Sequence, residues 1–407
     1  MDRLTVVDEI FLRTHRGMGT PIALQGLWRI PDAMEPALLH RIHDRLRVGD
    51  LGRRVVRARV PGARRGWRPN TSAHPLDRAG TPLPEHAILP WADTLGTDLD
   101  PEFGPGWRLS CAPLHDGGTV VALTCSHALA DARGLIHAVD AALGELGAID
   151  DDLPDTLATA SDWADARAQW VTIIGGTARA LRRGIPRPPA TTTHEPSPDR
   201  SVHSTLLVFD AAEWDATAAA TGGTPNSLFI HLVANILWET GFQHPGIAAS
   251  LPVDTRDEPR VDNDLAMTEI AIDRTDTPAT IRDKARTAYL RRMSSPAGLP
   301  EEILQVLPDR WAYALSRGAG ERDILCSNIG TLPDSLRAVG THHCDRVAAR
   351  AIHPGITDLP RTRLAGYLSR LGDTYTLALV SLAADRETLR TALSRACATA
   401  GISAASW

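Results

Sequence analysis

Residues 120–135 read VVALTCSHALADARGL and hold the side chains best suited to chemistry. The apolar run Val120–Cys125 is typical of a strand, and His127 follows it where we expect a loop. Four residues later, Asp131 precedes a helical pattern, where its carboxylate can cap the first amide groups. An imidazole in this place could act as a general base near pH 7. These residues alone favour a half-buried loop histidine bonded to backbone, so the rest of the chain must decide.

The length and composition of the chain predict a globular protein with two domains. At 407 residues the chain exceeds the size that one hydrophobic core usually serves. Hydrophobic residues make up 43% and charged residues 23%, as in ordinary globular proteins. The stretch GIPRPPATTTHEPSPDR, residues 184–200, is typical of an extended linker. We therefore expect an N-terminal subdomain at residues 1–183 and a C-terminal subdomain at residues 201–407.

Apolar periodicity predicts a similar mix of strands and helices in both halves. Strands are expected at residues 22–30, 120–125, 205–209, 247–252, 324–330, 363–369 and 375–381. Helices are expected at residues 6–14, 34–47, 135–143, 163–183, 228–239 and 281–292, with a closing helix from residue 387. Residues 69–106 are rich in proline, glycine and aspartate, and long irregular passages of this kind are often functional.

The charge of the chain is unevenly distributed. The net charge of −6 argues against general affinity for nucleic acid. Residues 53–68, RRVVRARVPGARRGWR, nevertheless carry seven arginines and no acidic residue. This stretch could attract a phosphate, an acidic carrier protein or an anionic membrane surface at the periphery of the protein. The simpler interpretation is a solvated hairpin around Gly62.

Cysteine usage and hydropathy point to a reduced, cytoplasmic protein. The five cysteines are widely spaced and form no CxxC pair. His342, His343 and Cys344 are adjacent, but with Cys326 they lack the paired spacing of structural zinc sites, so we predict no metal. Charged residues interrupt every apolar run at the N-terminus, and no later segment approaches the twenty apolar residues of a membrane span.

Common catalytic motifs are absent from the sequence. It contains no GxSxG, GxGxxG, GxxxxGK[ST] or HExxH, which leaves the hydrolase, dinucleotide, P-loop and metalloprotease interpretations unsupported. The His127 segment is therefore the main candidate for an active site.

Six segments, in order along nearly the whole chain, resemble the wax ester synthase and diacylglycerol acyltransferase family. They read LTVVDEIFLRTHRGMGTPIALQGL, LDPEFGPGWRLSC, SHALADARG, TPNSLFIHLVANIL, LPVDTR and SNIGTLP. The family belongs to the CoA-dependent acyltransferase superfamily, together with chloramphenicol acetyltransferase, polyketide-associated acyltransferases and peptide-synthetase condensation domains. SHALADARG matches the superfamily signature HHxxxDG at its second histidine, His127, and at its aspartate, Asp131.

The segments also depart from the family pattern. Ser126 stands at the first signature histidine, Ala132 at the signature glycine and Ser227 at the aspartate of an Asn-Asp pair. These departures put a lipid substrate in doubt. The resemblance still implies an α/β fold class, with two chloramphenicol-acetyltransferase-like subdomains. Each would be a mixed sheet flanked by helices, and the two would meet at a tunnel with the histidine at its centre.

The resemblance also implies roles for single residues. His127 would be the base and Asp131 would hold its loop by pairing with Arg256, for which the alternative is a surface arginine. Ser126 would either donate a hydrogen bond into the tunnel or allow a tight turn. Three further residues match positions that line or brace the channel in relatives: Asn226, Ser327 and Asn328. For Asn226 the alternative is a helix cap.

Arg133 indicates something about the substrate. A cation at a helix N-terminus is electrostatically unfavourable, so the side chain needs a reason to stay there. We hypothesise that Arg133 faces an anionic or polar group of a substrate; the alternative is that it extends into solvent.

The leading functional hypothesis is an O-acyltransferase of lipid or secondary metabolism. It would move an acyl group from an acyl-CoA or acyl-carrier-protein thioester to a hydroxyl of a small molecule, with no tightly bound cofactor. A free-standing condensation-type enzyme that joins carrier-bound substrates through an amide or ester is the second hypothesis. The third is a catalytically silent scaffold, which the substitutions at Ser126, Ala132 and Ser227 favour and the retention of His127 and Asp131 opposes.

Overall fold

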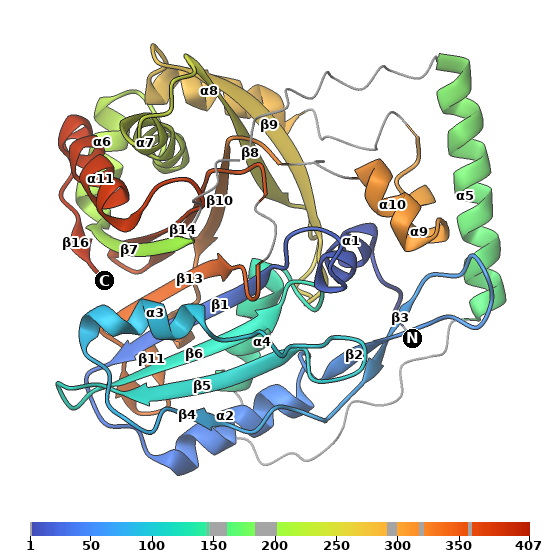
Figure 1. The fold of residues 1–407 in the computed structure, drawn as a ribbon, viewed down its shortest axis with the longest axis horizontal. Helices are drawn as coiled ribbons and strands as arrows, with labels where there is room; N and C mark the ends of the chain where they lie inside the picture. Colours follow the sequence, from blue (N-terminus) through green and yellow to red (C-terminus); the bar gives the residue numbers. More distant parts are fainter. Residues whose placement is uncertain are drawn as a thin grey trace.

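Strand-forming runs from distant parts of the chain build two β-sheets, each flanked by helices (Figure 1). A computed structural model of the protein describes residues 2–144, 146, 161–183, 202–290, 299–316, 321–356 and 360–407. The predicted fold class, two mixed sheets with flanking helices, is confirmed. The predicted linker, residues 184–200, lies outside the described residues.

The first sheet has the strand order β13-β1-β6-β5-β4 and forms the lower lobe in Figure 1. Its strands are β1 (Ala23–Ile30), β4 (Asp77–Arg78), β5 (Trp107–Pro113), β6 (Thr119–Ser126) and β13 (Arg346–Ile352). Helices of this half are α1 (Val6–His15), α2 (Pro36–Val48), α3 (Ile88–Asp93), α4 (Ala132–Gly144) and α5 (Asp162–Arg183), and β2 (Arg53–Val56) pairs with β3 (Gly66–Pro69) in a separate hairpin.

The second sheet has the order β16-β7-β15-β14-β10-β8-β9. Its strands are β7 (His203–Asp210), β8 (Gly246–Asp254), β9 (Leu265–Asp273), β10 (Ile324–Thr331), β14 (Leu364–Leu371), β15 (Thr374–Ser381) and β16 (Ala405–Ser406). The helices are α6 (Ala211–Ala220), α7 (Pro225–Glu239), α8 (Pro278–Tyr289), α9 (Ile303–Val306), α10 (Asp309–Ser316) and α11 (Arg386–Ala400), and β11 (Ala338–Val339) pairs with β12 (His342–His343). Several elements were not expected from the sequence, and the longest of them are α6, β9, α10 and β13.

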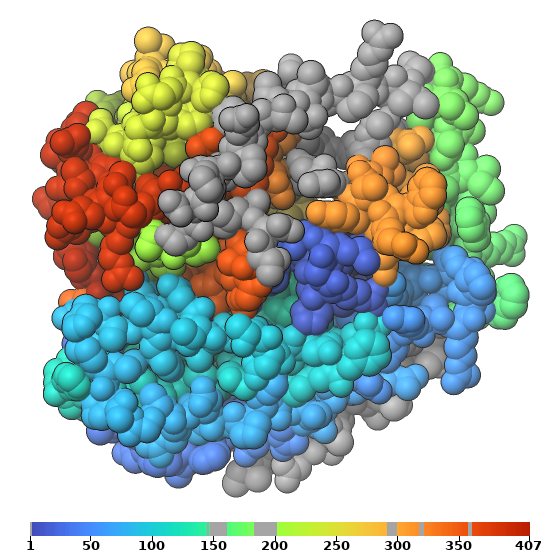
Figure 2. Space-filling model, viewed as in Figure 1, coloured from blue at the N-terminus to red at the C-terminus, as the bar shows by residue number. Residues whose placement is uncertain are grey.

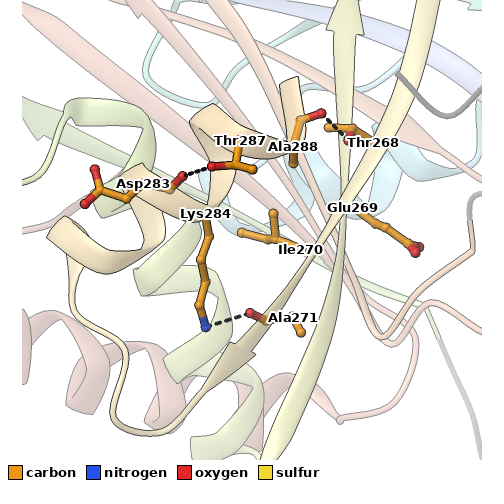
Figure 3. A pocket seen from close by; sticks show the side chains of 8 residues that line it. All are labelled: Thr268, Glu269, Ile270, Ala271, Asp283, Lys284, Thr287 and Ala288. Atoms are coloured by element: carbon orange, nitrogen blue, oxygen red, sulfur yellow. Dashed lines mark hydrogen bonds between the residues drawn. The ribbon is translucent and has the colours of Figure 1, made fainter. Parts of the chain in front are cut away.

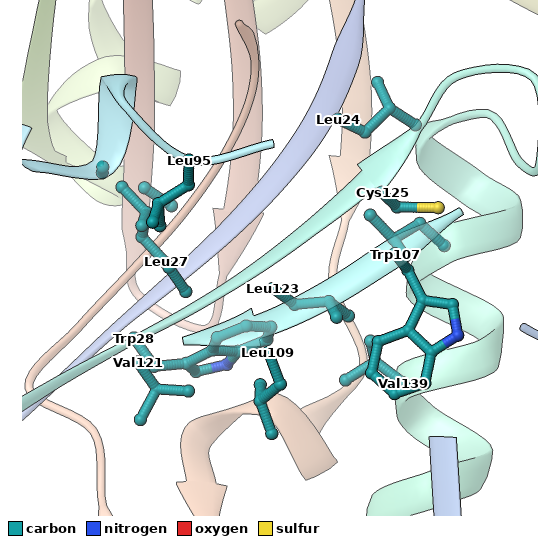
Figure 4. Packing of buried hydrophobic residues seen from close by; sticks show 14 of the residues in the cluster. Leu24, Leu27, Trp28, Leu95, Trp107, Leu109, Val121, Leu123, Cys125 and Val139 are labelled. Carbon is teal, nitrogen blue, oxygen red and sulfur yellow. The ribbon is translucent and has the colours of Figure 1, made fainter. Parts of the chain in front are cut away.

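The strand that leads to His127 is buried throughout. All eight residues of β6 are buried, because the strand lies between β1 and β5 and the faces of the sheet are covered. This explains its continuous apolar run, since a strand buried on both faces shows no alternation. Trp107 of β5 and Val139 of α4 belong to the same hydrophobic cluster as Leu123 and Cys125 of β6 (Figure 4). The end of β6 is therefore firmly anchored.

One strand of the first sheet comes from the second half of the chain. β13 pairs antiparallel with β1, with Gly26 opposite Ala349. The Thr376 hydroxyl of β15 also donates a hydrogen bond of 3.0 Å to the Val347 carbonyl oxygen, which links the two sheets through β13. The two halves of the chain thus share a sheet as well as an interface.

The arginine-rich stretch forms the expected hairpin, β2 with β3, but it is less free than a solvated hairpin would be. Most of its arginines bind acidic residues of other elements: Arg53 pairs with Asp262, Arg57 with Glu102, Arg64 with Asp165, and Arg65 with Glu9 and Asp309. Figure 2 shows α1 in dark blue, lodged between the lower lobe and α10 in orange. The paired arginines therefore connect these elements, while Arg59 and Arg68 remain exposed.

Among the described helices, none has both the length and the hydropathy needed to cross a lipid bilayer.

Candidate functional site

His127 lies in a tight turn at the end of β6. The turn is closed by a hydrogen bond from the Leu129 amide to the Ser126 carbonyl oxygen, at 2.9 Å. The His127 amide donates to the Ile22 carbonyl oxygen at 3.2 Å, which ties the turn to the start of β1. The imidazole is half-buried and stacks on Phe11 of α1, with ring centroids 3.6 Å apart and an interplanar angle of 13°. The backbone and one face of the ring are therefore fixed.

A loop from the second half of the chain covers this turn. We call residues 255–264, which connect β8 to β9, the clamp loop. Its Asp264 amide donates to Asp131 Oδ2 at 3.0 Å, and its Arg256 Nη2 donates to Asp131 Oδ1 at 2.5 Å. The backbone of Val261 lies so close to α4 that a Cβ on Gly134 would be 2.3 Å from the Val261 carbonyl oxygen. The loop thus packs directly on the start of α4.

Asp131 has two structural contacts besides the clamp loop backbone. Its Oδ1 accepts the Gly134 amide at 2.9 Å, so it caps α4 as the sequence predicted. The same carboxylate forms an ion pair with Arg256, and the two side chains are only 6% and 8% exposed. Arg256 also donates through Nε to the Arg260 carbonyl oxygen, at 3.0 Å. The structure therefore brings together the two residues that the motifs suggested as partners.

Asn263 of the clamp loop holds the imidazole itself. Asn263 Oδ1 lies 3.0 Å from His127 Nδ1, and Asn263 Nδ2 donates to the His127 carbonyl oxygen at 2.8 Å. Nδ2 also donates to Asp8 Oδ1 at 2.8 Å. An amide oxygen can only accept a hydrogen bond, so the His127 Nδ1 must carry the proton. In the neutral ring, Nε2 then has the free lone pair.

Burial controls the charges of His127 and Asp8. It lowers the pKa of His127 below its ordinary value, which leaves the ring neutral at pH 7. Burial also raises the pKa of Asp8 to about 6, although the positive charge of Arg53 opposes this shift. Arg53 lies nearby because its Nη2 donates to the Leu129 carbonyl oxygen at 2.5 Å and its Nη1 to Asp262 at 2.6 Å. A neutral imidazole with a free Nε2 can accept a proton from a substrate.

Two further predicted site residues, Ser126 and Arg133, lie next to the His127 turn. The Ser126 hydroxyl is buried and accepts the Ala128 amide at 3.3 Å, which fits the tight-turn alternative. Arg133 does not extend freely into solvent, because its Nη1 donates to the Thr331 carbonyl oxygen at 3.2 Å. Its guanidinium also lies over Gly330, where a Cβ would be 2.6 Å from Nη2. Arg133 therefore links α4 to the end of β10.

The remaining predicted residues form a separate group on the second lobe. Asn328 Nδ2 donates to Asn226 Oδ1 at 3.0 Å, and Asn226 Nδ2 donates to the Tyr289 hydroxyl at 2.9 Å. Ser327 is half-buried on β10, opposite Tyr367 of β14. Within the described part of the chain, no hydrogen bond joins these residues to His127. Thr224, not Asn226, is the cap of α7.

Sequence reasoning missed four residues of the site: Asp8, Phe11, Arg53 and Asn263. Asp8 and Phe11 lie in the N-terminal segment that carries part of the family resemblance, and that was the only signal available for them. Asn263 lies beyond the end of the LPVDTR motif, and no residue pattern marks it. Among the described residues, no group of three His, Cys, Asp or Glu is arranged to hold a metal ion.

Two grooves formed by described residues lie elsewhere. The larger one, of about 690 Å³, runs between β9 and α8, and Figure 3 shows its lining. Lys284 donates across it to the Ala271 carbonyl oxygen at 3.0 Å, and Thr268 donates to the Ala288 carbonyl oxygen at 3.0 Å. The second, of about 350 Å³, lies beside β2 and is lined by Glu102 and Phe103, among others. His127 lines neither groove.

Structural comparison finds known proteins similar to this chain, whereas the two sequence comparisons find none. A scan against protein-family models finds no match, and no curated protein matches. The condensation domain of the Monacolin K polyketide synthase MokA is 12% identical, with a TM-score of 0.62, over 98% of this chain and 96% of that one. Polyketide synthase associated protein 5 from Mycobacterium tuberculosis is 14% identical, with a TM-score of 0.59, over 98% of each chain.

A longer protein also contains this fold. The nonribosomal peptide synthetase FmoA3 is 18% identical, with a TM-score of 0.57, over 98% of this chain. The present chain spans only 42% of the length of FmoA3. At these identities the matches establish the fold and no more. The chain thus has the two-lobed fold of condensation domains and polyketide-associated proteins.

Proposed function

We propose that the chain is a condensation-type acyltransferase that moves an acyl group from a carrier-bound thioester to an amine or hydroxyl acceptor. The observation that carries the proposal is the neutral His127, whose Nδ1 proton is engaged by Asn263 so that Nε2 is left with a free lone pair. The likeness to condensation domains and to a polyketide-associated protein supports a carrier-bound donor.

The reaction would need His127 as a proton carrier. Nε2 takes the proton of the acceptor N–H or O–H as that atom attacks the thioester carbonyl carbon. A bond then forms between the acceptor atom and this carbon, and the carbon–sulfur bond breaks. The imidazolium returns the proton to the departing thiolate, so the products are an amide or ester and a free thiol. No covalent enzyme intermediate is required.

A base explains only part of such a rate. Positioned bases typically contribute about 10²- to 10⁴-fold, so proximity of the two substrates and stabilisation of the oxyanion supply the rest. Asp131 and Arg256 act here by holding the turn and touch no reacting atom in this scheme.

A second candidate is transfer from acyl-CoA to a hydroxyl, as the resemblance to wax ester synthases and diacylglycerol acyltransferases implies. The ordered segments that the chain shares with that family, LPVDTR and SNIGTLP among them, motivate it. Both candidates use the same base and differ in the group that carries the thioester.

The test compares the two donors directly. Octanoyl and aminoacyl groups are presented on a phosphopantetheinylated carrier protein and on CoA, each with a panel of small amines and alcohols. Thiol release is followed together with the mass of the product, for the unaltered protein and for His127→Ala. Carrier-dependent product formation that requires His127 would support the proposal. Faster transfer from CoA would favour the second candidate, and absence of product with every donor would favour a silent scaffold.

A further inference from the structure

The Asn263 amide lies behind the His127 ring, and the Asp8 carboxylate lies behind that amide. His127 Nδ1 meets Asn263 Oδ1, and Asn263 Nδ2 meets Asp8 Oδ1. Asp8 belongs to α1 at the start of the chain, and Asn263 belongs to the clamp loop in the second half. Both are almost completely buried, at 0% and 1% exposure. Two segments remote in sequence therefore meet behind the imidazole.

The orientation of the Asn263 amide is fixed by its surroundings. Nδ2 donates to two acceptors, the Asp8 carboxylate and the His127 carbonyl oxygen, each at 2.8 Å. A flipped amide would place its oxygen against both acceptors and lose both bonds, while its NH₂ group would face Nδ1. Leaving buried polar groups unpaired costs about 1–3 kcal/mol each, so the flipped state is strongly disfavoured. Asn263 can then only accept from His127.

Asp8 is equally well fixed. Its Oδ2 accepts the Thr5 amide at 2.7 Å, while the Thr5 hydroxyl accepts the Asp8 amide at 3.0 Å, so the two residues form the capping box of α1. Its Oδ1 also accepts the Asn263 amide of the backbone at 3.1 Å. The Thr5 hydroxyl in turn donates to the Asn263 carbonyl oxygen at 3.1 Å. The helix start therefore holds both the backbone and the side chain of Asn263.

We propose that Asp8 and Asn263 are a positioning pair that locks His127 in the tautomer with the proton on Nδ1 and separates the ring from the Asp8 carboxylate. The tautomer follows from the contacts alone, whereas its value for catalysis rests on the proposed function. A carboxylate placed directly on Nδ1 would stabilise the imidazolium and favour the protonated ring. A neutral amide orients the ring just as well but leaves it uncharged and ready to accept a proton.

The tautomer is measured by nitrogen NMR of the full chain labelled with ¹⁵N-histidine, without any substrate. The chain has 15 histidines, so the signals of His127 are identified by their loss in His127→Gln. At pH 7.5 the unaltered protein is expected to show a protonated Nδ1 and an unprotonated Nε2. A protonated Nε2, or an imidazolium, would overturn the proposal at once, whatever the activity.

Three variants then test the pair. Asn263→Ala is expected to give a mixture of tautomers and to lower kcat about 10- to 100-fold with little change in KM. This loss is smaller than the ~10⁴-fold drop in kcat that a wrong histidine tautomer causes in a serine protease triad. Asn263→Asp is expected to raise the His127 pKa and move the acidic limb of the pH profile upward. Asn235→Ala is the control, because it removes another Asn–His contact, with His231 in α7, and is expected to leave His127 unchanged.

The outcomes separate this proposal from the proposed function. An unchanged His127 tautomer and pKa in folded Asn263→Ala and Asn263→Asp would contradict the positioning pair, even if the enzyme transfers acyl groups. Expected NMR shifts without turnover on any donor would support the pair and count against acyl transfer. If Asn263→Ala does not fold, Asp8→Asn, which keeps the side-chain shape, replaces it and is expected to increase the population of the other tautomer.

Discussion

His127 and Asp131 are only four residues apart, yet their side chains do different work. The imidazole contacts Asn263 and Phe11, whereas the carboxylate contacts Arg256 and the first turn of α4. Asp131 therefore places the turn, and Asn263 with Asp8 places the ring within it. This division explains how the base can be neutral although two buried carboxylates lie near it.

The charge state of His127 predicts the pH dependence of the reaction. The base must be neutral, and burial lowers its pKa below the ordinary value of 6.5, so the rate is expected to be constant from pH 7 to 8. The rate should fall as the pH drops below about 6.5, because both His127 and Asp8, with its pKa of about 6, then take up protons. The profile of kcat/KM between pH 5 and 8 measures this. A midpoint above pH 7 would contradict a buried, uncharged base.

Some residues of the site could be predicted from the sequence and others could not. His127, Asp131 and Arg256 could be predicted, because each lies in a segment with a recognisable pattern. Asn263 could not, because its role arises only when the clamp loop reaches a turn 136 residues earlier in the chain. Arg133 was placed correctly at the start of a helix, but its contact with Thr331 depends on the packing of the two lobes.

At the scale of elements, the clamp loop is the part that joins the lobes at the site. It contributes the Asp264 amide, Arg256 and Asn263 to the turn and to α4. Arg53 of the hairpin adds a second connection, since it bonds both Asp262 and the Leu129 carbonyl oxygen. Movement of this loop would therefore displace the base.

Arg256→Ala is expected to destabilise the protein by about 3–5 kcal/mol, because it leaves the Asp131 carboxylate buried without its cation. Arg260→Ala is a matched control in the same loop. The Arg260 side chain is 40% exposed and pairs with Asp264, so its loss is expected to cost less than about 1 kcal/mol. Chemical denaturation measures both variants. Equal effects would mean that the Asp131–Arg256 pair does not anchor the loop.

Most elements were predictable from periodicity, and the exceptions have physical causes. The strand β9 does alternate, with Ile270 and Ile272 buried between exposed residues, but no clear turn signal separates it from the clamp loop. The apolar pattern of β13 is interrupted by Arg350. This arginine is buried in the folded protein, where it donates to Gln25 and pairs with Asp93. Such partners cannot be read from local sequence.

At the scale of the whole molecule, the two lobes depend on each other. β13 comes from the second half and completes the first sheet, while the arginines of the hairpin pair with Asp262 and Asp309 of the second half. The composition and the linker pattern predicted two comparable halves. They did not predict this exchange, because strand pairing over such a separation leaves no local signal.

This exchange predicts that the halves cannot fold separately. A fragment of residues 1–183 would expose the edge of β1 that β13 normally covers, and an uncovered apolar edge favours aggregation. We expect this fragment to be insoluble alone and to form a soluble complex when co-expressed with residues 202–407. Size-exclusion chromatography of each fragment and of the pair tests this. A cooperative, monomeric 1–183 fragment would show that β13 is dispensable.

The central claim is that His127 is the base of an acyl transfer, and a single-turnover experiment tests it most directly. The acyl-loaded carrier is mixed with excess acceptor and enzyme, and the formation of product is timed for the unaltered protein, His127→Ala and His231→Ala. We predict a rate about 10²- to 10⁴-fold lower for His127→Ala and an unchanged rate for His231→Ala, which removes another partly buried histidine. Equal rates for the unaltered protein and His127→Ala would contradict the claim.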